Sequence, residues 1–454
     1  MQPDDQSEPN LRTTLLSANG CSRARKGDLL LEPQPQQLIA AQEARRVVPF
    51  IKRFKPIIRL LQIFGYYPNG YRTAVLPRTK TFVFTRLTSY YWAPAGLAYL
   101  AINIFIGHMN LKQLYHMTYE LRMGILETYV ITTIITGILP LHNTVNFMVL
   151  LCRVRKHNQL LKDMSVTDEA FQRSFKTVLP LTHTCYMLVW STIAIVTISF
   201  FLRMTELCMV DIPENMVNGI IVFSIPIVPL LRTWQLLPLL YFNAICSCAR
   251  YWYSELNRRI RSDPMCRNRP MKFYYEHFLQ LTGLTRRIGS LYNPFILFSL
   301  ATSVIVLCLA IYFVTQKNDI LPDYPGDWFA TAAAYFTLGW ALLQVILQIM
   351  YIAVICITGW KTNEAARAIL QTVLASQPET EEDKFHVIRF VQKMSTQYTW
   401  GITVWRAFPI ERGLLMTVTS TIIAWAIILS RFKTQKCFPL GTGIIAQVLN
   451  ATST

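Results

Sequence analysis

Residues 291–315 read LYNPFILFSLATSVIVLCLAIYFVT and contain no charged side chain. An α-helix rises about 1.5 Å per residue, so a helix of this length exceeds the ~30 Å hydrocarbon core of a bilayer. The rest of the chain holds further apolar stretches of about the same length. They are 88–109, 124–152, 180–202, 217–242, 328–358 and 409–431. We therefore predict an all-α protein with seven membrane-spanning helices.

The composition agrees with a membrane protein and excludes several other classes. Of the 454 residues, 52% are hydrophobic and only 15% are charged, whereas soluble proteins have about 25% charged residues. A soluble enzyme, a disordered protein and a fibrous protein are thereby excluded. The sequence has no HExxH, P-loop, GxSxG or paired CxxC motif, so we expect no catalytic activity, no metal site and no cofactor.

The distribution of positive charge predicts how the chain is oriented. Together, the segments 1–87, 153–179, 249–290 and 359–408 contain 35 Lys and Arg residues. The intervening segments contain four, and they are 110–123, 203–216 and 316–327. Because positively charged loops remain cytoplasmic, the N-terminus is predicted inside the cell and the C-terminus outside. This asymmetry accounts for the net charge of +18 without a nucleic-acid partner.

This topology divides the chain into segments with different expected roles. The polar, Gln/Pro/Ser-rich residues 1–50 are expected to be disordered in the cytoplasm. The other segments are an amphipathic lead-in at 51–87, six helices with an outer ligand pocket at 88–358, a cytoplasmic anchor region at 359–408, the seventh helix at 409–431 and an extracellular tail at 432–454. The sequon Asn450-Ala451-Thr452 lies in that tail and is a candidate glycosylation site, although such tripeptides also occur by chance.

Two local patterns add to the predicted topology. Residues 54–68 read FKPIIRLLQIFGYYP, a Leu-rich amphipathic turn that closes on Gly and Pro, and residues 424–432 read AWAIILSRF. Together they resemble the insect gustatory and odorant receptor superfamily, including its nematode gustatory-like members. The second stretch is similar to the gustatory signature Thr-Tyr-x5-Gln-Phe with its spacing intact. Ala424, Trp425 and Arg431 differ from that signature, and Phe432 matches it.

The resemblance implies a gustatory-type chemosensory receptor in the cell membrane, acting as a homotetrameric ligand-gated cation channel. In that family the seventh helix lines a central pore, and the cytoplasmic ends of helices four to seven join the subunits. A small-molecule tastant binds in the outer half of each subunit. The alternative is a light- or peroxide-responsive receptor of the nematode type, which signals through G proteins rather than by its own conduction.

The seventh helix carries the candidate pore residues. Its polar stripe favours a water-filled path, although packing of small residues between helices is the alternative explanation. Arg431 either extends to the outer headgroups or faces the pore and disfavours cations; alternatively, conduction is not the main output. The candidates are Thr417, Thr421, Ala424, Ile428, Arg431 and Phe432. Glu411 is expected either to attract cations at the inner mouth or to pair with Arg412.

Large aromatic residues supply the anchor candidates, which are Trp400, Trp405 and Phe408. Phe385, Ile388 and Val391 form a partial apolar stripe in the same segment, which suits an intersubunit bundle made by an extended sixth helix and a return helix. Positions at the membrane interface would explain the aromatic residues equally well.

The pocket candidates combine ionisable and aromatic side chains in the outer halves of the spans. A charge inside a membrane is costly and usually functional, and Trp and Tyr can stack on a ligand and also hydrogen-bond to it. Pro226, Pro229 and Pro238 are expected to kink the helix around Arg232. The candidates are Glu127, Trp190, Arg232, Tyr312, Trp328, Tyr335 and Trp340. The alternative for each aromatic residue is packing against lipid or the core, and for Glu127 it is a position at the membrane interface. Gln344 and Gln348 are interpreted as interhelical contacts, and His142 as a packing residue.

Overall fold

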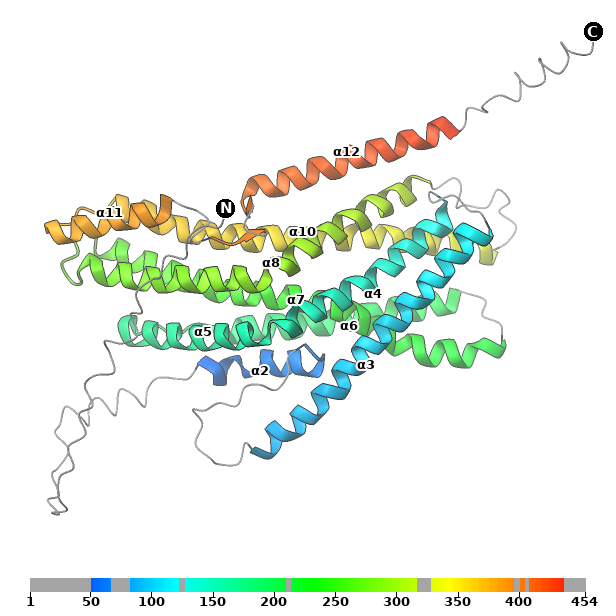
Figure 1. The fold of residues 1–454 in the computed structure, drawn as a ribbon, viewed down its shortest axis with the longest axis horizontal. Helices are drawn as coiled ribbons and strands as arrows, with labels where there is room; N and C mark the ends of the chain where they lie inside the picture. Colours follow the sequence, from blue (N-terminus) through cyan, green and yellow to red (C-terminus); the bar gives the residue numbers. More distant parts are fainter. Residues whose placement is uncertain are drawn as a thin grey trace, which may run out of the picture. The chain divides into compact units, whose positions relative to one another are not determined.

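The computed structural model describes residues 50–66, 82–121, 127–209, 214–316, 328–395, 401–404 and 408–436. Nearly all of these residues are helical (Figure 1). The helices are α2 (Phe50–Ile63), α3 (Phe82–Tyr115), the π-helical turn η1 (His116–Glu120), α4 (Thr128–Cys152), α5 (Val154–Phe175), α6 (Leu181–Met209), α7 (Glu214–Ser262), α8 (Met271–Thr315), α10 (Trp328–Leu374), α11 (Glu381–Ser395) and α12 (Arg412–Lys436). The strands β1 (Thr403–Val404) and β2 (Phe408–Pro409) form one short antiparallel pair.

The seven predicted spans correspond to helices α3, α4, α6, α7, α8, α10 and α12. The prediction of an all-α helical bundle is therefore confirmed. Within the described residues, four segments are long and apolar enough to cross a membrane. They are Val130–Cys152, Leu181–Thr205, Met271–Thr315 and Ala334–Leu374.

Two segments that the sequence analysis treated as basic loops contain long helices. Most of the segment 153–179 forms α5 (Val154–Phe175), and α7 and α8 extend well into the 249–290 segment. The buried face of α5 includes Leu160, Met164, Thr167, Phe171 and Phe175, which are spaced three or four residues apart as in an amphipathic helix. Counting the charges between the spans does not reveal this helix, because the count ignores the spacing of the apolar residues.

The helix α2 occupies the first part of the segment 51–87, for which an amphipathic lead-in is predicted. It buries one face against the bundle through Phe50, Phe54, Ile57 and Leu61. The helix stops at Gly65, whose φ of 78° requires a left-handed conformation that glycine adopts at little cost. The N–H groups of Gly65 and Tyr66 bond back to the carbonyls of Gln62 and Leu61, which is the pattern of a Schellman helix end.

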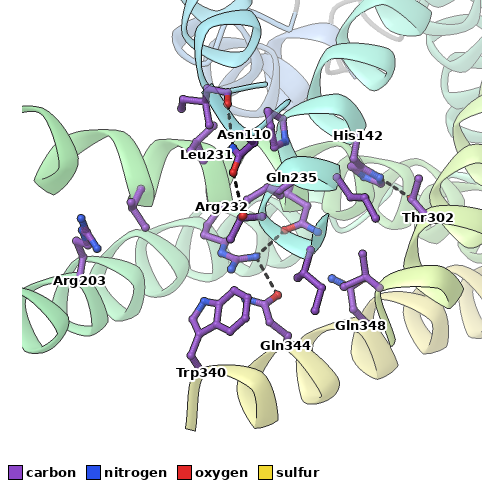
Figure 2. A pocket seen from close by; sticks show the side chains of 18 residues that line it. Asn110, His142, Arg203, Leu231, Arg232, Gln235, Thr302, Trp340, Gln344 and Gln348 are labelled. Carbon is purple, nitrogen blue, oxygen red and sulfur yellow. Dashed lines mark hydrogen bonds between the residues drawn. The ribbon is translucent and has the colours of Figure 1, made fainter. Parts of the chain in front are cut away.

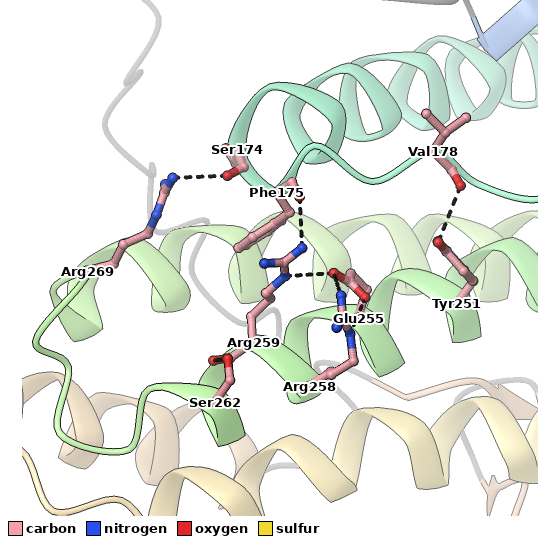
Figure 3. Close-up of polar contacts among 9 residues, drawn as sticks. All are labelled: Ser174, Phe175, Val178, Tyr251, Glu255, Arg258, Arg259, Ser262 and Arg269. Carbon is pink, nitrogen blue, oxygen red and sulfur yellow. Dashed lines mark hydrogen bonds and ion pairs between the residues drawn. The ribbon is translucent and has the colours of Figure 1, made fainter.

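Arginine side chains on α7 and after it hold the C-terminal end of α5 (Figure 3). The last carbonyls of a helix have no partner within it. Arg259 donates to the carbonyl of Phe175 at 2.9 Å, and Arg269 donates to that of Ser174 at 3.0 Å. Glu255 in turn accepts hydrogen bonds from Arg258 and Arg259. Part of the positive charge on this side therefore stabilises helix ends within the chain.

A single asparagine on α10 fixes the segment that precedes α12. The Asn363 side chain donates to the carbonyls of Ile402 and Ile410, both at 3.0 Å, and accepts from the N–H of Ile402 at 2.7 Å. A Cβ at Gly359 would lie 2.8 Å from side-chain atoms of Ile410, so glycine lets this segment pack directly on α10. The direction in which α12 leaves the bundle therefore depends on α10.

A buried histidine on α5 makes the fold sensitive to acid. His157 Nε2 is hydrogen-bonded to the Tyr241 hydroxyl on α7, and burial lowers the pKa of His157 from 6.5 to about 3. As the pH falls below about 6.5, the unfolded chain takes up a proton that the folded chain resists. We expect the free energy of unfolding in detergent micelles to drop by about 2 kcal/mol between about pH 6.5 and about pH 5. Urea titrations at a series of pH values would measure this drop.

His157→Gln should remove that part of the pH dependence. His183→Gln removes an exposed histidine on α6 and serves as the control, so its slope shows the effect of losing a histidine that is not buried. Identical slopes in both variants would contradict the assignment.

Candidate functional site

A cavity of about 240 Å³ lies among helices α3, α4, α6, α7, α8 and α10 (Figure 2). Most of its wall is apolar, but several polar side chains point into an otherwise hydrophobic bundle. The lining residues include Ile106, Asn110, Ile135, Thr136, His142, Arg203, Arg232, Gln235, Thr302, Trp340, Gln344 and Gln348. Apolar walls with a few polar groups are typical of small-molecule sites.

Arg232 is the central cation of the cavity. It lies on α7 between Pro229 and Pro238, and its guanidinium donates to Gln235 Oε1 at 3.2 Å and to Gln344 Oε1 at 3.4 Å. The first of these acceptors is on the same helix and the second is on α10. Within the described residues, no carboxylate forms an ion pair with Arg232. Two neutral amides therefore orient this charge but do not neutralise it.

His142 on α4 lines the cavity and is hydrogen-bonded to two other helices. Its Nδ1 lies 2.7 Å from Thr302 Oγ1, and that hydroxyl donates to the carbonyl of Phe298 at 2.9 Å. The hydroxyl therefore accepts from His142, which assigns the ring proton to Nδ1. Nε2 then accepts from the Tyr351 hydroxyl at 3.3 Å. This network fixes α4 against α8 and α10.

The structure brings two of the seven predicted pocket residues to the cavity, Arg232 and Trp340. Tyr312 is buried in the core cluster against which Trp340 packs, one layer behind the wall. Trp190 and Tyr335 are 63% and 57% exposed and do not line this cavity. Glu127 is exposed just before α4, and the side chain of Trp328 lies outside the described part of the chain.

Three lining residues were interpreted differently from the sequence. The sequence predicts interhelical contacts for Gln344 and Gln348 and a packing role for His142, and all three line the cavity. Gln344 has both roles, since it contacts Arg232 on α7 and also lines the cavity. The sequence signal for this role is the pair of amides at positions i and i+4 within the apolar run of α10. The sequence does not show which neighbouring helix this face of α10 meets.

The pore candidates lie on an uncovered side of α12. Leu414, Leu415, Val418 and Ile422 pack against the core, whereas Thr417, Thr421, Ala424 and Ile428 are exposed. Arg431 and Phe432 belong to the helix, but their side chains lie outside the described part. Glu411 pairs with Arg367 at 2.7 Å, and the adjacent Arg412 pairs with Glu364 at 3.2 Å.

Of the anchor candidates, only Phe408 falls on described residues, and it is 63% exposed on β2. Trp400, Trp405 and the candidate glycosylation site Asn450 lie outside them. On α11 the buried face consists of Asp383, His386, Phe390 and Met394. The apolar stripe of Phe385, Ile388 and Val391 is exposed on the other face.

We expect Thr302→Val to destabilise the chain, because it removes the acceptor of His142 and leaves a buried N–H without a partner. The loss in the free energy of unfolding should be about 1–3 kcal/mol, measured by urea titration in micelles. Thr372→Val provides the matched control, since that hydroxyl donates to Ala368 in its own helix. An equal effect of the two substitutions would refute the assigned role of Thr302.

Comparison with known proteins agrees with this architecture. A family model described as 7tm Chemosensory receptor matches residues 54–436. A curated relative, the probable G-protein coupled receptor egl-47 of Caenorhabditis elegans, is 32% identical over 344 residues. The match covers 73% of this chain and 65% of the relative's length.

Two solved structures share the fold. The insect olfactory receptor OR5 from Machilis hrabei superposes with a TM-score of 0.57 at 12% identity, covering 83% of this chain and 97% of that one. The same receptor in complex with eugenol gives a TM-score of 0.58 at 12% identity, with coverages of 84% and 98%. The resemblance seen in the sequence is thereby confirmed: the chain is a multi-pass membrane protein and belongs to the 7tm chemosensory receptor family.

Proposed function

We propose that this receptor is a cation channel opened by a small molecule that binds in the Arg232 cavity, and that four copies form its pore. The observation that carries the proposal is a cavity with convergent polar groups inside an apolar bundle. Polar groups are costly at that depth and are usually retained for function. The homologous fold of OR5 has been solved in complex with eugenol, which supports a small organic ligand for this chain as well.

The exposed polar side of α12 supports the conduction part of the proposal. Thr417, Ser420 and Thr421 donate their hydroxyl protons to carbonyls one turn earlier in the helix, at 2.8–2.9 Å. Their oxygen lone pairs remain available on the outside. A surface of oxygen acceptors suits a passing cation better than an anion. By contrast, Met416, Ile423 and Ile427 fall on a separate, apolar face and suit lipid.

Two uncovered surfaces support assembly with further copies. One is the polar side of α12, and the other is the apolar stripe Phe385, Ile388 and Val391 on α11. Both surfaces lie C-terminal to the part of α10 that lines the cavity. From the sequence, α12 is predicted to line the pore, and α11 lies in the predicted anchor region. A ring of copies would cover the apolar stripe and turn the hydroxyl oxygens toward a shared axis.

Signalling through a G protein is the second candidate, because the nematode relative is named as a probable G-protein coupled receptor. In this interpretation the basic 249–290 segment would contact the partner. Six of its nine Lys and Arg residues already bond within the chain, namely Arg250, Arg258, Arg259, Arg267, Arg269 and Arg287. Because these six side chains are already bonded within the chain, fewer positive charges remain to contact a G protein. We therefore favour intrinsic conduction.

Cysteine accessibility in excised membrane patches tests the pore. The chain would be expressed in cells without sensory machinery, and Thr421→Cys and Ile423→Cys would each be exposed to a cationic methanethiosulfonate reagent. We expect the reagent to reduce the current of Thr421→Cys several-fold, because the modified side chain places a positive charge in the cation path. It should leave Ile423→Cys and the unmodified chain unchanged.

Modification of Ile423→Cys alone would contradict the assigned pore face. A current that requires added cytosolic G protein would instead support the second candidate.

A further inference from the structure

The charge of Arg232 is the least balanced feature of the cavity. Its two described partners are the neutral side-chain oxygens of Gln235 and Gln344. A guanidinium has five N–H donors arranged as a planar fork, and this fork matches a carboxylate in a two-bond geometry. Because a cation within a membrane bundle is costly without a counter-charge, the cavity favours an anionic occupant.

A second donor points to the same chemistry. Gln344 is only 2% exposed. Its Oε1 accepts from Arg232, while its buried Nε2 has no hydrogen-bond partner among the residues that the structure describes. Buried amide N–H groups in native proteins are nearly always satisfied. Figure 2 shows Gln344 projecting from α10 toward Arg232, so one acceptor group placed between the two helices could bond to both side chains.

The rest of the wall limits the size and polarity of the occupant. Ile106, Ile135, Ile138, Leu139 and Val306 supply apolar surface, and Trp340 supplies an aromatic face. The volume of about 240 Å³ lies below the roughly 300–1,000 Å³ of sites for drug-sized ligands. A small molecule with one acidic group and an apolar body fits these walls.

We propose that the cavity binds a small organic monocarboxylate, with its carboxylate held between Arg232 and Gln344 and its hydrocarbon part against the apolar wall. This inference rests on the proposed role of the cavity as the ligand site and specifies the chemical class. Arg232 supplies the charge, Gln344 supplies a neutral donor, and the aliphatic residues supply the surface for the hydrocarbon part.

Paired probes that differ only in charge test the proposal. Benzoate and benzamide have nearly the same shape, as do hexanoate and hexanamide. Each would be titrated into the full chain in lipid nanodiscs, with the shift in melting temperature giving the Kd. We expect both acids to bind at least tenfold more tightly than their amides. Sodium chloride at the same concentrations should give no saturable shift.

Gln344→Glu is the sharpest variant, because it is nearly isosteric and provides Arg232 with a permanent carboxylate. We expect it to raise the melting temperature without ligand and to weaken acid binding by about tenfold to a hundredfold. Amide binding should be preserved. Gln371→Glu adds the same charge at an exposed position on the same helix and should leave acid binding unchanged.

Each other outcome has a defined meaning. Equal binding of acids and amides, unaffected by Gln344→Glu, would overturn the charge assignment while leaving the cavity as a ligand site. A saturable chloride response that Gln344→Glu abolishes would replace the organic acid with an inorganic anion. If no probe binds and Ile135→Trp, which fills the cavity, leaves receptor currents unchanged, the proposed function fails as well.

Discussion

Inside a bilayer every backbone N–H and C=O must find its partner within the protein, and the rest of this structure depends on that constraint. Long helices satisfy the constraint without help, which is why the predicted spans are helical. Prolines break it locally. In α7, Pro238 has no N–H for the carbonyl of Trp234, which instead accepts a hydrogen bond from the Tyr66 hydroxyl. The same constraint makes any buried polar side chain informative, because it too needs a partner that lipid cannot provide.

The polar groups of this chain fall into two classes by this criterion. In the first, helix ends and connecting segments are closed by side chains, as where Arg259 and Arg269 reach the end of α5, or where Asn363 holds the segment before α12. These bonds are complete and structural. In the second, around Arg232 and Gln344, a charge and a donor remain incompletely matched. Other buried polar atoms of the described residues also lack a partner, so the feature that distinguishes the candidate site is a charge that faces a cavity with only neutral partners.

How much the sequence could predict follows from the same distinction. Spans such as 291–315 were predictable because length and apolar composition determine them, and Arg232 because a charge inside a span is conspicuous. The rotation of each helix about its axis was not predictable, so Trp190 and Tyr335 were grouped with Trp340 although they face outward. Gln344 could not be distinguished from an ordinary interhelical amide, since its role depends on which residue of α7 it meets. The amphipathic helix α5 was visible in the spacing of its apolar residues but was obscured by its charges.

The arrangement also limits how the cavity could influence α12. Two described helices both line the cavity and pack extensively against α12, namely α8 and α10. α10 is continuous from Trp340 and Gln344 to Asn363, which holds the segment before α12. A ligand shifts an equilibrium only by its difference in affinity between two states. A group bound between α7 and α10 has such a difference if the distance from Arg232 to Gln344 changes with the position of α10. Gln344, which would bind the ligand, and Asn363, which contacts the segment before α12, then lie on the same helix. Movement of α10 alone would connect the cavity to α12.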